Sequence, residues 1–249
     1  MKRLIAVLML MAVALPVPGR AQEEATPSFT IYGSALLPAG TYKASLGTNP
    51  GITRRFGFDI GEDAGLAAVG GGVGCDLRIP VLTRGLDWVV SLQGLVNGVR
   101  TEDALDLFRD ELHDTVAVGM STGAWIHVPL FTGLAYGIDL GDGLQLDMTA
   151  QGGIHVTRQA PRTVMVHGTV VEETSFQFMP DFGYQVGAGF SFAGGYQILL
   201  RYVDLGTPRY EGTQVLNEKY FTTIPRKENA INGDPRRVSM FLIALGYTL

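Results

Sequence analysis

The C-terminal stretch Val238–Leu249, with the sequence VSMFLIALGYTL, alternates between two kinds of side chain. Successive side chains of a strand point to opposite faces of a sheet, so every second residue shares a face. One face carries only large apolar groups, and its members are Phe241, Ile243, Leu245, Tyr247 and Leu249. The other face carries smaller or weakly polar residues, among them Ala244 and Gly246. This pattern predicts a strand with lipid on one side and a crowded interior on the other.

The same alternation recurs along the chain. The expected strands are Ser28–Leu37, Leu66–Val81, Trp88–Asn97, Thr122–Asp139, Leu144–Thr157, Asp181–Phe192, Tyr196–Val203 and Val238–Leu249. Their connections alternate between long and short, with the short ones at Thr83, Leu140 and Ala193. Short periplasmic turns and long outer loops are typical of membrane barrels. The sequence therefore predicts an all-β fold, an eight-stranded antiparallel up-and-down transmembrane β-barrel with short periplasmic turns and long extracellular loops.

Three long connections carry patterns of their own. Thr101–Leu112 has an N-capping threonine, acidic residues in the first turn and apolar residues at helical spacing, which predicts one short loop helix. That helix could pack on the barrel rim or bind a partner. Valines flank His167-Gly168, which predicts a hairpin extending two strands above the membrane. Gly206–Arg237 contains proline and both charge signs, which predicts a long loop.

The N-terminus has the features of a secretory signal. Lys2 and Arg3 precede the apolar run from Leu4 to Leu15, and Ala21 offers a cleavage position. We expect residues 1–21 to be a signal peptide and residues 22–249 to form a single barrel domain. Cleavage would change the net charge from −5 to −8, which argues against a nucleic-acid partner. The chain has a single cysteine, Cys75, which excludes an internal disulfide.

Ionisable side chains fall on the inward-facing side of several expected strands. These candidate lumen residues are Asp76, Arg78, His127, Asp139, Asp147, His155 and Arg201. The interior of an eight-stranded barrel is just wide enough for side chains to fill it, so we expect a structural polar network that closes the lumen. A metal site from His127 and His155 lacks close ligand spacing. His113, His167 and Ser175 share no recognisable motif, so no catalytic residues, metal or cofactor are assigned.

Tyr247, near the end of the closing strand, belongs to a pattern seen in a known family. The strand is similar to the C-terminal assembly signal of bacterial outer-membrane barrels, with Leu249 where that family usually carries phenylalanine. The mature chain as a whole resembles the small eight-stranded outer-membrane β-barrel family, also called porin-family proteins. The resemblance implies a place in the bacterial outer membrane. Outer-membrane lipids and the barrel-assembly machinery are then the expected partners, and the long loops could bind an extracellular ligand.

A resemblance to this family indicates where a protein is located better than it indicates which function the protein has. The leading expectation is a structural or surface-interaction barrel with a largely filled lumen and no enzymatic activity. Two alternatives remain open, a narrow porin-like conduit for small or hydrophobic solutes and a lipid A-modifying enzyme.

Overall fold

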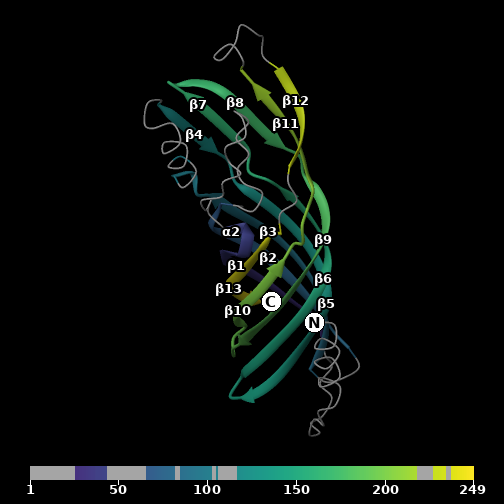
Figure 1. Cartoon of the computed structure of the whole chain (residues 1–249). Helices are drawn as coiled ribbons and strands as arrows, with labels where there is room; N and C mark the ends of the chain where they lie inside the picture. Colours follow the sequence, from purple (N-terminus) through teal and green to yellow (C-terminus); the bar gives the residue numbers. More distant parts are fainter. Residues whose placement is uncertain are drawn as a thin grey trace.

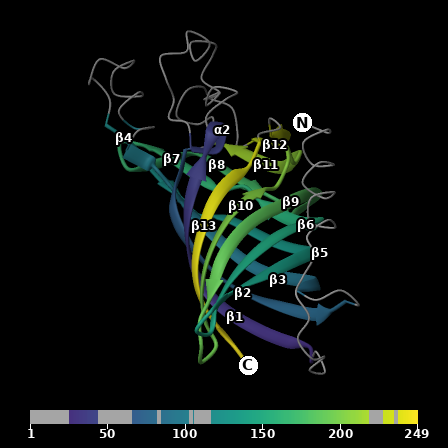
Figure 2. The same cartoon turned by 90° about the horizontal axis from the view of Figure 1, so that it is seen from below.

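The computed structural model describes residues 26–43, 66–81, 85–102, 105, 117–217, 227–233 and 237–249. Eight strands close into an antiparallel barrel in the order β1-β13-β10-β9-β6-β5-β3-β2. Their bounds are β1 Ser28–Ala39, β2 Ala67–Pro80, β3 Leu86–Val99, β5 Trp125–Gly141, β6 Leu144–Arg158, β9 Met179–Ser191, β10 Tyr196–Asp204 and β13 Ser239–Thr248. The expected eight-stranded barrel is confirmed, and Figure 2 shows the strands from the end that carries the C-terminus.

The barrel closes where the first and last strands meet. β1 pairs with β13 from Thr30 opposite Thr248 to Ala39 opposite Ser239. Within β13 the two faces differ sharply, because Leu245 is 68% exposed and Ala244 is 1% exposed. Since a shift of one residue would exchange these faces, the inward and outward assignment predicted for the closing strand is confirmed.

A second sheet stands at one end of the barrel (Figure 1). It contains β4 Val118–Thr122, β7 Arg162–Val166, β8 Thr169–Phe176, β11 Tyr210–Leu216 and β12 Lys227–Gly233, in the order β12-β11-β8-β7-β4. The described connections between barrel strands at the opposite end are short. The end with the second sheet is therefore the end of the long outer connections.

The second sheet continues the barrel wall in register. Thr157 lies opposite Met179 in the β6–β9 pair, and five residues farther along each strand Arg162 lies opposite Thr174 in the β7–β8 pair. The pairs β4–β7, β8–β11 and β11–β12 likewise keep the offsets of β5–β6, β9–β10 and β10–β13. Backbone hydrogen bonds cross the junctions, including one of 2.8 Å from Gly123 N to Pro161 O. One side of the barrel is thus much taller than the other; we call this extension the outer sheet.

The hairpin expected around His167 is confirmed. His167 and Gly168 both have positive φ, of 48° and 76°, as a two-residue turn between twisted strands requires. The expected loop Gly206–Arg237 is wrong in part, because it contains the hairpin of β11 and β12. Thr213, Gln214 and Val215 pair on both sides within the outer sheet, and these neighbours favour extended structure where the sequence pattern was weak.

Some of the strand bounds also differ from those expected from the sequence. β1 continues through Pro38 to Ala39, since proline is tolerated near a strand end. The strand expected at Thr122–Asp139 is divided between β4 and β5. Pro129 causes no register shift between β3 and β5, although the pairing around it is interrupted. The segment 1–21 and most of Thr101–Leu112 lie outside the described residues.

Helix contributes little to the described part of the chain. The short helix α2, Gly40–Lys43, follows β1 at the outer end of the barrel and places Tyr42 in a fully buried position. None of the described helical residues belongs to a helix long and apolar enough to cross a membrane.

Candidate functional site

The interior of the barrel, here called the lumen, contains a buried ion pair joined to two hydroxyl groups. Arg201 on β10 donates a hydrogen bond to Asp76 on β2, and both side chains are 1% exposed. Ser91 donates to Asp76 at 2.7 Å, and Arg201 donates to the Tyr32 hydroxyl at 3.0 Å while lying over its ring. Four strands therefore meet at one carboxylate, and the pair has the additional hydrogen bonds that a buried charge requires.

A second ion pair crosses the lumen nearer the periplasmic turns. Arg78 Nη1 on β2 lies 2.7 Å from Asp147 Oδ1 on β6. Gln145 donates to the same carboxylate at 2.9 Å, and Ser191 on β9 donates to its other oxygen. The pair connects strands that are not neighbours in the barrel wall. It therefore places side chains across the interior where an open channel would need free space.

Three glutamines form a third cross-lumen contact. Gln93 on β3 donates to Gln185 on β9 at 2.8 Å, and Gln185 donates to Gln151 on β6. All three side chains are buried. Because an amide both donates and accepts, the three glutamines connect β3, β9 and β6 across the lumen without net charge.

A chain of hydrogen bonds with one direction lies nearer the outer end. The Leu205 carbonyl can only accept, so Nε2 of His155 donates to it at 2.7 Å. Nδ1 of neutral His155 then accepts from Thr157 at 2.9 Å, and Thr157 accepts from Nδ1 of His127 at 3.2 Å. This leaves Nε2 of His127 to accept from the Tyr42 hydroxyl at 2.8 Å. Burial raises the pKa of Tyr42 well above its ordinary value, which keeps this donor protonated.

Aromatic rings pack at the outer end of this chain of hydrogen bonds. Tyr42 meets Trp125 edge-on with ring centres 5.3 Å apart, and Trp125 meets Tyr210 at 5.7 Å. Phe176 packs on Tyr210 at 6.3 Å. Trp125, Tyr42 and Tyr210 are almost fully buried. We call Tyr42, Trp125, Phe176 and Tyr210 the outer cap, because they join α2, β5, β8 and β11 over the outer mouth of the lumen.

The structure places six of the seven candidate lumen residues inside the barrel and one elsewhere. Asp139 is exposed at the periplasmic end, where its carboxylate accepts the Gly141 N–H at 2.8 Å. The pairing of β5 and β6 shifts between Asp139 and Gly141, so the strand alternation ends there. Its assignment to the lumen network is therefore corrected to an exposed residue of β5 beside the periplasmic turn. His127 and His155 meet only through Thr157, and the described residues contain no group of three His, Cys, Asp or Glu able to hold a metal.

Sequence reasoning missed the outer cap. Trp125 has the same inward position as His127 two residues later, so extending the β5 alternation would have found it. Tyr42 and Tyr210 lie beyond the barrel strands, where no alternation indicates their direction. Phe131, also buried in the lumen, shares the inward position of His127 but was not assigned from the sequence.

The outside of the barrel is apolar where the inside is polar. Many large apolar side chains on the outward faces of the barrel strands are exposed, including those of β13, and the exposure reaches 75% at Phe182. Aromatic residues gather toward both ends, with Tyr184 near Tyr202 at the outer end and Tyr196 near Tyr247 at the turn end. Closed barrels satisfy every backbone group in lipid, and an apolar band between aromatic girdles is the surface that lipid requires. The protein is an eight-stranded outer-membrane β-barrel.

Sequence comparisons do not place this barrel in a family, because no family model and no curated protein match it. Its fold is similar to a major outer membrane protein from Thermus thermophilus, with 10% identity and a TM-score of 0.49 over 90% of this chain and 100% of that one. It is also similar to Ail, the attachment invasion locus protein of Yersinia pestis, with 9% identity and a TM-score of 0.41 over 90% and 97% of the two chains. For the outer membrane protein OprG from Pseudomonas aeruginosa the identity is 10%, the TM-score 0.41 and the coverage 89% and 95%. Because these TM-scores lie below 0.5, the assignment rests on the barrel's own pairing and exterior.

Proposed function

We propose that the protein is a closed membrane scaffold that presents its outer sheet for interactions at the cell surface. The observation that carries this proposal is the combination of a lumen crossed by ion pairs with a wall extended on one side. The Arg201–Asp76 and Arg78–Asp147 pairs bridge the interior, and the outer cap covers its mouth. A closed lumen does not suit transport, whereas a wall extended on one side provides a surface for interactions. Both features therefore support a surface-interaction role more than a transport role.

The outer sheet has one buried face and one exposed polar face. Val164, Glu172 and Thr174 are buried, whereas Glu173, Ser175 and Glu211 are exposed. A polar exposed face suits a partner bound through hydrogen bonds and charge, and the hairpins that carry it keep the register of the barrel. A rigid, polar platform of this kind would bind an extracellular ligand with little loss of backbone freedom.

The experiment compares conductance with surface binding. The mature protein, refolded in planar bilayers, should give no large, stable single-channel current. Cells carrying the wild-type barrel should bind more extracellular matrix protein than cells carrying a barrel with Ser175→Lys and Glu211→Lys, which reverse the charge character of the polar face. Stable currents together with unchanged binding would favour the narrow conduit and contradict the scaffold.

A lipid A-modifying enzyme receives less support. His167 occupies a hairpin turn and Ser175 lies near the far end of the following strand, so they do not form a nucleophile and base within hydrogen-bond reach. Lipid A from cells that overproduce the barrel should be unchanged in mass. The assembly-signal role of the outward residues of β13 stays a prediction, as does recognition by the assembly machinery.

A further inference from the structure

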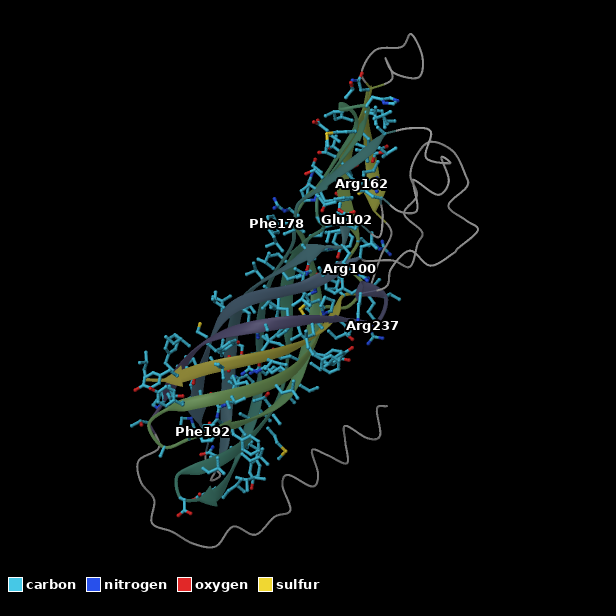
Figure 3. All side chains as sticks on the ribbon, turned by 90° about the vertical axis from the view of Figure 1, so that its left-hand side faces the viewer. Arg100, Glu102, Arg162, Phe178, Phe192 and Arg237 are labelled. Atoms are coloured by element: carbon cyan, nitrogen blue, oxygen red, sulfur yellow. The ribbon has the colours of Figure 1, made fainter. Side chains whose placement is uncertain are left out.

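Three arginines at the outer end of the barrel donate hydrogen bonds to oxygen atoms. Arg162 donates to Glu172 at 2.5 Å, Arg237 donates to Asp204 at 3.0 Å, and Arg100 donates to the Lys43 carbonyl. Each of these guanidinium groups has an oxygen partner. Figure 3 shows Phe192 near one end of the barrel and Arg100, Arg162 and Arg237 farther toward the outer sheet.

Arg158, the last residue of β6, has a different environment. Its guanidinium lies over the ring of Phe178, with Cζ 5.1 Å from the ring centre. Within the described part of the chain no oxygen accepts from its guanidinium group, and its Nε, like that of Arg162, is buried without a hydrogen-bond partner. An arginine stacked on an aromatic ring keeps its outer N–H edge available, and that edge fits the two oxygens of a phosphate.

The position of this pair indicates the source of the phosphate. Arg158 has the same outward direction as Val156 and Ile154, so it stands at the upper border of the lipid-facing band. Phe178 is 48% exposed and lies just before β9, whose Met179 pairs with Thr157. Figure 3 shows Phe178 at the edge of the barrel below Arg162. A cation at this level meets the head groups of the outer leaflet rather than its acyl chains.

An apolar track lies directly below the pair. Ile154 on β6 is opposite Phe182 on β9, and Phe182 is 75% exposed, the largest exposure among the large apolar side chains of the barrel strands. Arg158 lies four positions after Ile154, which corresponds to about 13 Å along a strand. A cation without an oxygen partner, an aromatic support and an apolar track thus follow one another along β6 and β9, as one lipid molecule would require.

We propose that Arg158 and Phe178 bind the phosphate-bearing head group of an outer-leaflet lipid, whose acyl chain lies along Val156, Ile154 and Phe182. The guanidinium supplies paired hydrogen bonds to the phosphate, and the ring holds the guanidinium in place. This site faces the membrane and is separate from the polar face of the outer sheet. The proposed lipid site and the proposed scaffold function are therefore independent, and a negative result for one does not affect the other.

The test measures lipid retention by native mass spectrometry of the mature barrel in zwitterionic detergent. The probes are lipid A, phosphatidylcholine and inorganic phosphate at equal phosphate concentration. Lipid A should remain bound to the wild type, and Arg158→Gln should weaken its apparent affinity by about tenfold or more. Arg158→Lys should keep part of the affinity as a point charge, and Phe178→Leu should cost roughly two- to fivefold.

The matched control is Arg209→Gln, which removes the same charge from an exposed arginine between β10 and β11. It should leave lipid A retention unchanged. Equal losses in Arg158→Gln and Arg209→Gln would reduce the effect to net charge and overturn the proposal. Wild-type affinity in Arg158→Gln would do the same, and displacement of lipid A by inorganic phosphate would show a free-anion site instead. Gel mobility before and after boiling checks folding, and if Arg158→Gln does not fold, Arg158→Lys and Phe178→Leu decide.

Discussion

The Tyr42 hydroxyl lies 2.8 Å from Nε2 of His127, so a residue that follows β1 is hydrogen-bonded to the inner face of β5. Neither residue is near the other in sequence, and both are buried. The contact ties the short helix α2 to the hydrogen-bond chain that ends at Leu205. It makes Tyr42, at the start of the first outer connection, part of the barrel interior.

Tyr42→Phe should therefore destabilise the folded barrel. The substitution keeps the ring of the outer cap but leaves a buried imidazole nitrogen without a donor, which costs about 1–3 kcal/mol. The free energy of unfolding can be measured by urea titration in lipid vesicles. Tyr247→Phe, on the exposed outer surface, is the matched control and should change stability by less than about 0.5 kcal/mol. Equal stability of Tyr42→Phe and the wild type would show that the hydroxyl contributes nothing.

Arg201→Met should be among the most damaging single substitutions in the lumen. It leaves Asp76 buried without its cation, and breaking a buried pair in this way costs about 3–5 kcal/mol. The double variant Asp76→Leu with Arg201→Met removes both charges and should recover much of the loss. Arg209→Met serves as the control for loss of an exposed arginine. The same unfolding titration checks all variants, and a double variant weaker than Arg201→Met would contradict the pairing.

The outer sheet should respond separately to loss of its own ion pair. Arg162→Met leaves Glu172 buried without its cation, although Thr174 still donates to it at 3.0 Å. We expect local opening of β7 and β8 while the barrel stays folded, because local units open at lower free energy than the whole. Limited proteolysis should cut the variant in the outer sheet and leave a boiling-sensitive barrel fragment. Glu211→Gln, an exposed change in the same sheet, should be cut no faster than the wild type.

The barrel strands were predictable because lipid and lumen impose opposite chemistry on alternate residues. The alternation of Gln145, Asp147 and Thr149 with apolar neighbours predicts both the extent and the direction of β6, and the structure agrees. The contrast is weaker in the outer sheet, because its exposed face is polar and its buried face combines Val164 with Glu172 and Thr174. Thr213 and Gln214 carry no signal of direction, so β11 and β12 were expected to be loop.

Side-chain partners were less predictable than side-chain direction. Alternation indicates that Asp76 and Arg201 both face inward, but only the order of strands around the barrel brings β2 and β10 into reach. Arg78 could have paired with any inward carboxylate, and the structure pairs it with Asp147. The assignment of Asp139 to the lumen was wrong, because the alternation on which it depended ends at the register shift before Gly141.

The outward and inward faces of the closing strand can be tested directly with Leu245 and Gly246. Leu245 is 68% exposed on the lipid side, whereas a Cβ at Gly246 would lie 3.1 Å from the Ile31 carbonyl and 3.2 Å from Cβ of Tyr32. Leu245→Arg should cost about 2–4 kcal/mol near the membrane midplane and less toward an interface. Leu245→Phe should be nearly neutral, because lipid can deform around the larger ring.

Gly246→Phe should behave in the opposite way to Leu245→Phe. The new ring would enter a packed interior next to Tyr32, and overpacking of this kind typically costs about 1–3 kcal/mol. Denaturant titrations of the three variants in vesicles give the comparison, with wild type as reference. Both variants place a phenylalanine ring on β13, one residue apart and on opposite faces, so their difference reports which face has room for the ring. Tolerance of Leu245→Arg together with loss of stability in Leu245→Phe would place lipid on the other face of β13 and reverse the assignment of this strand.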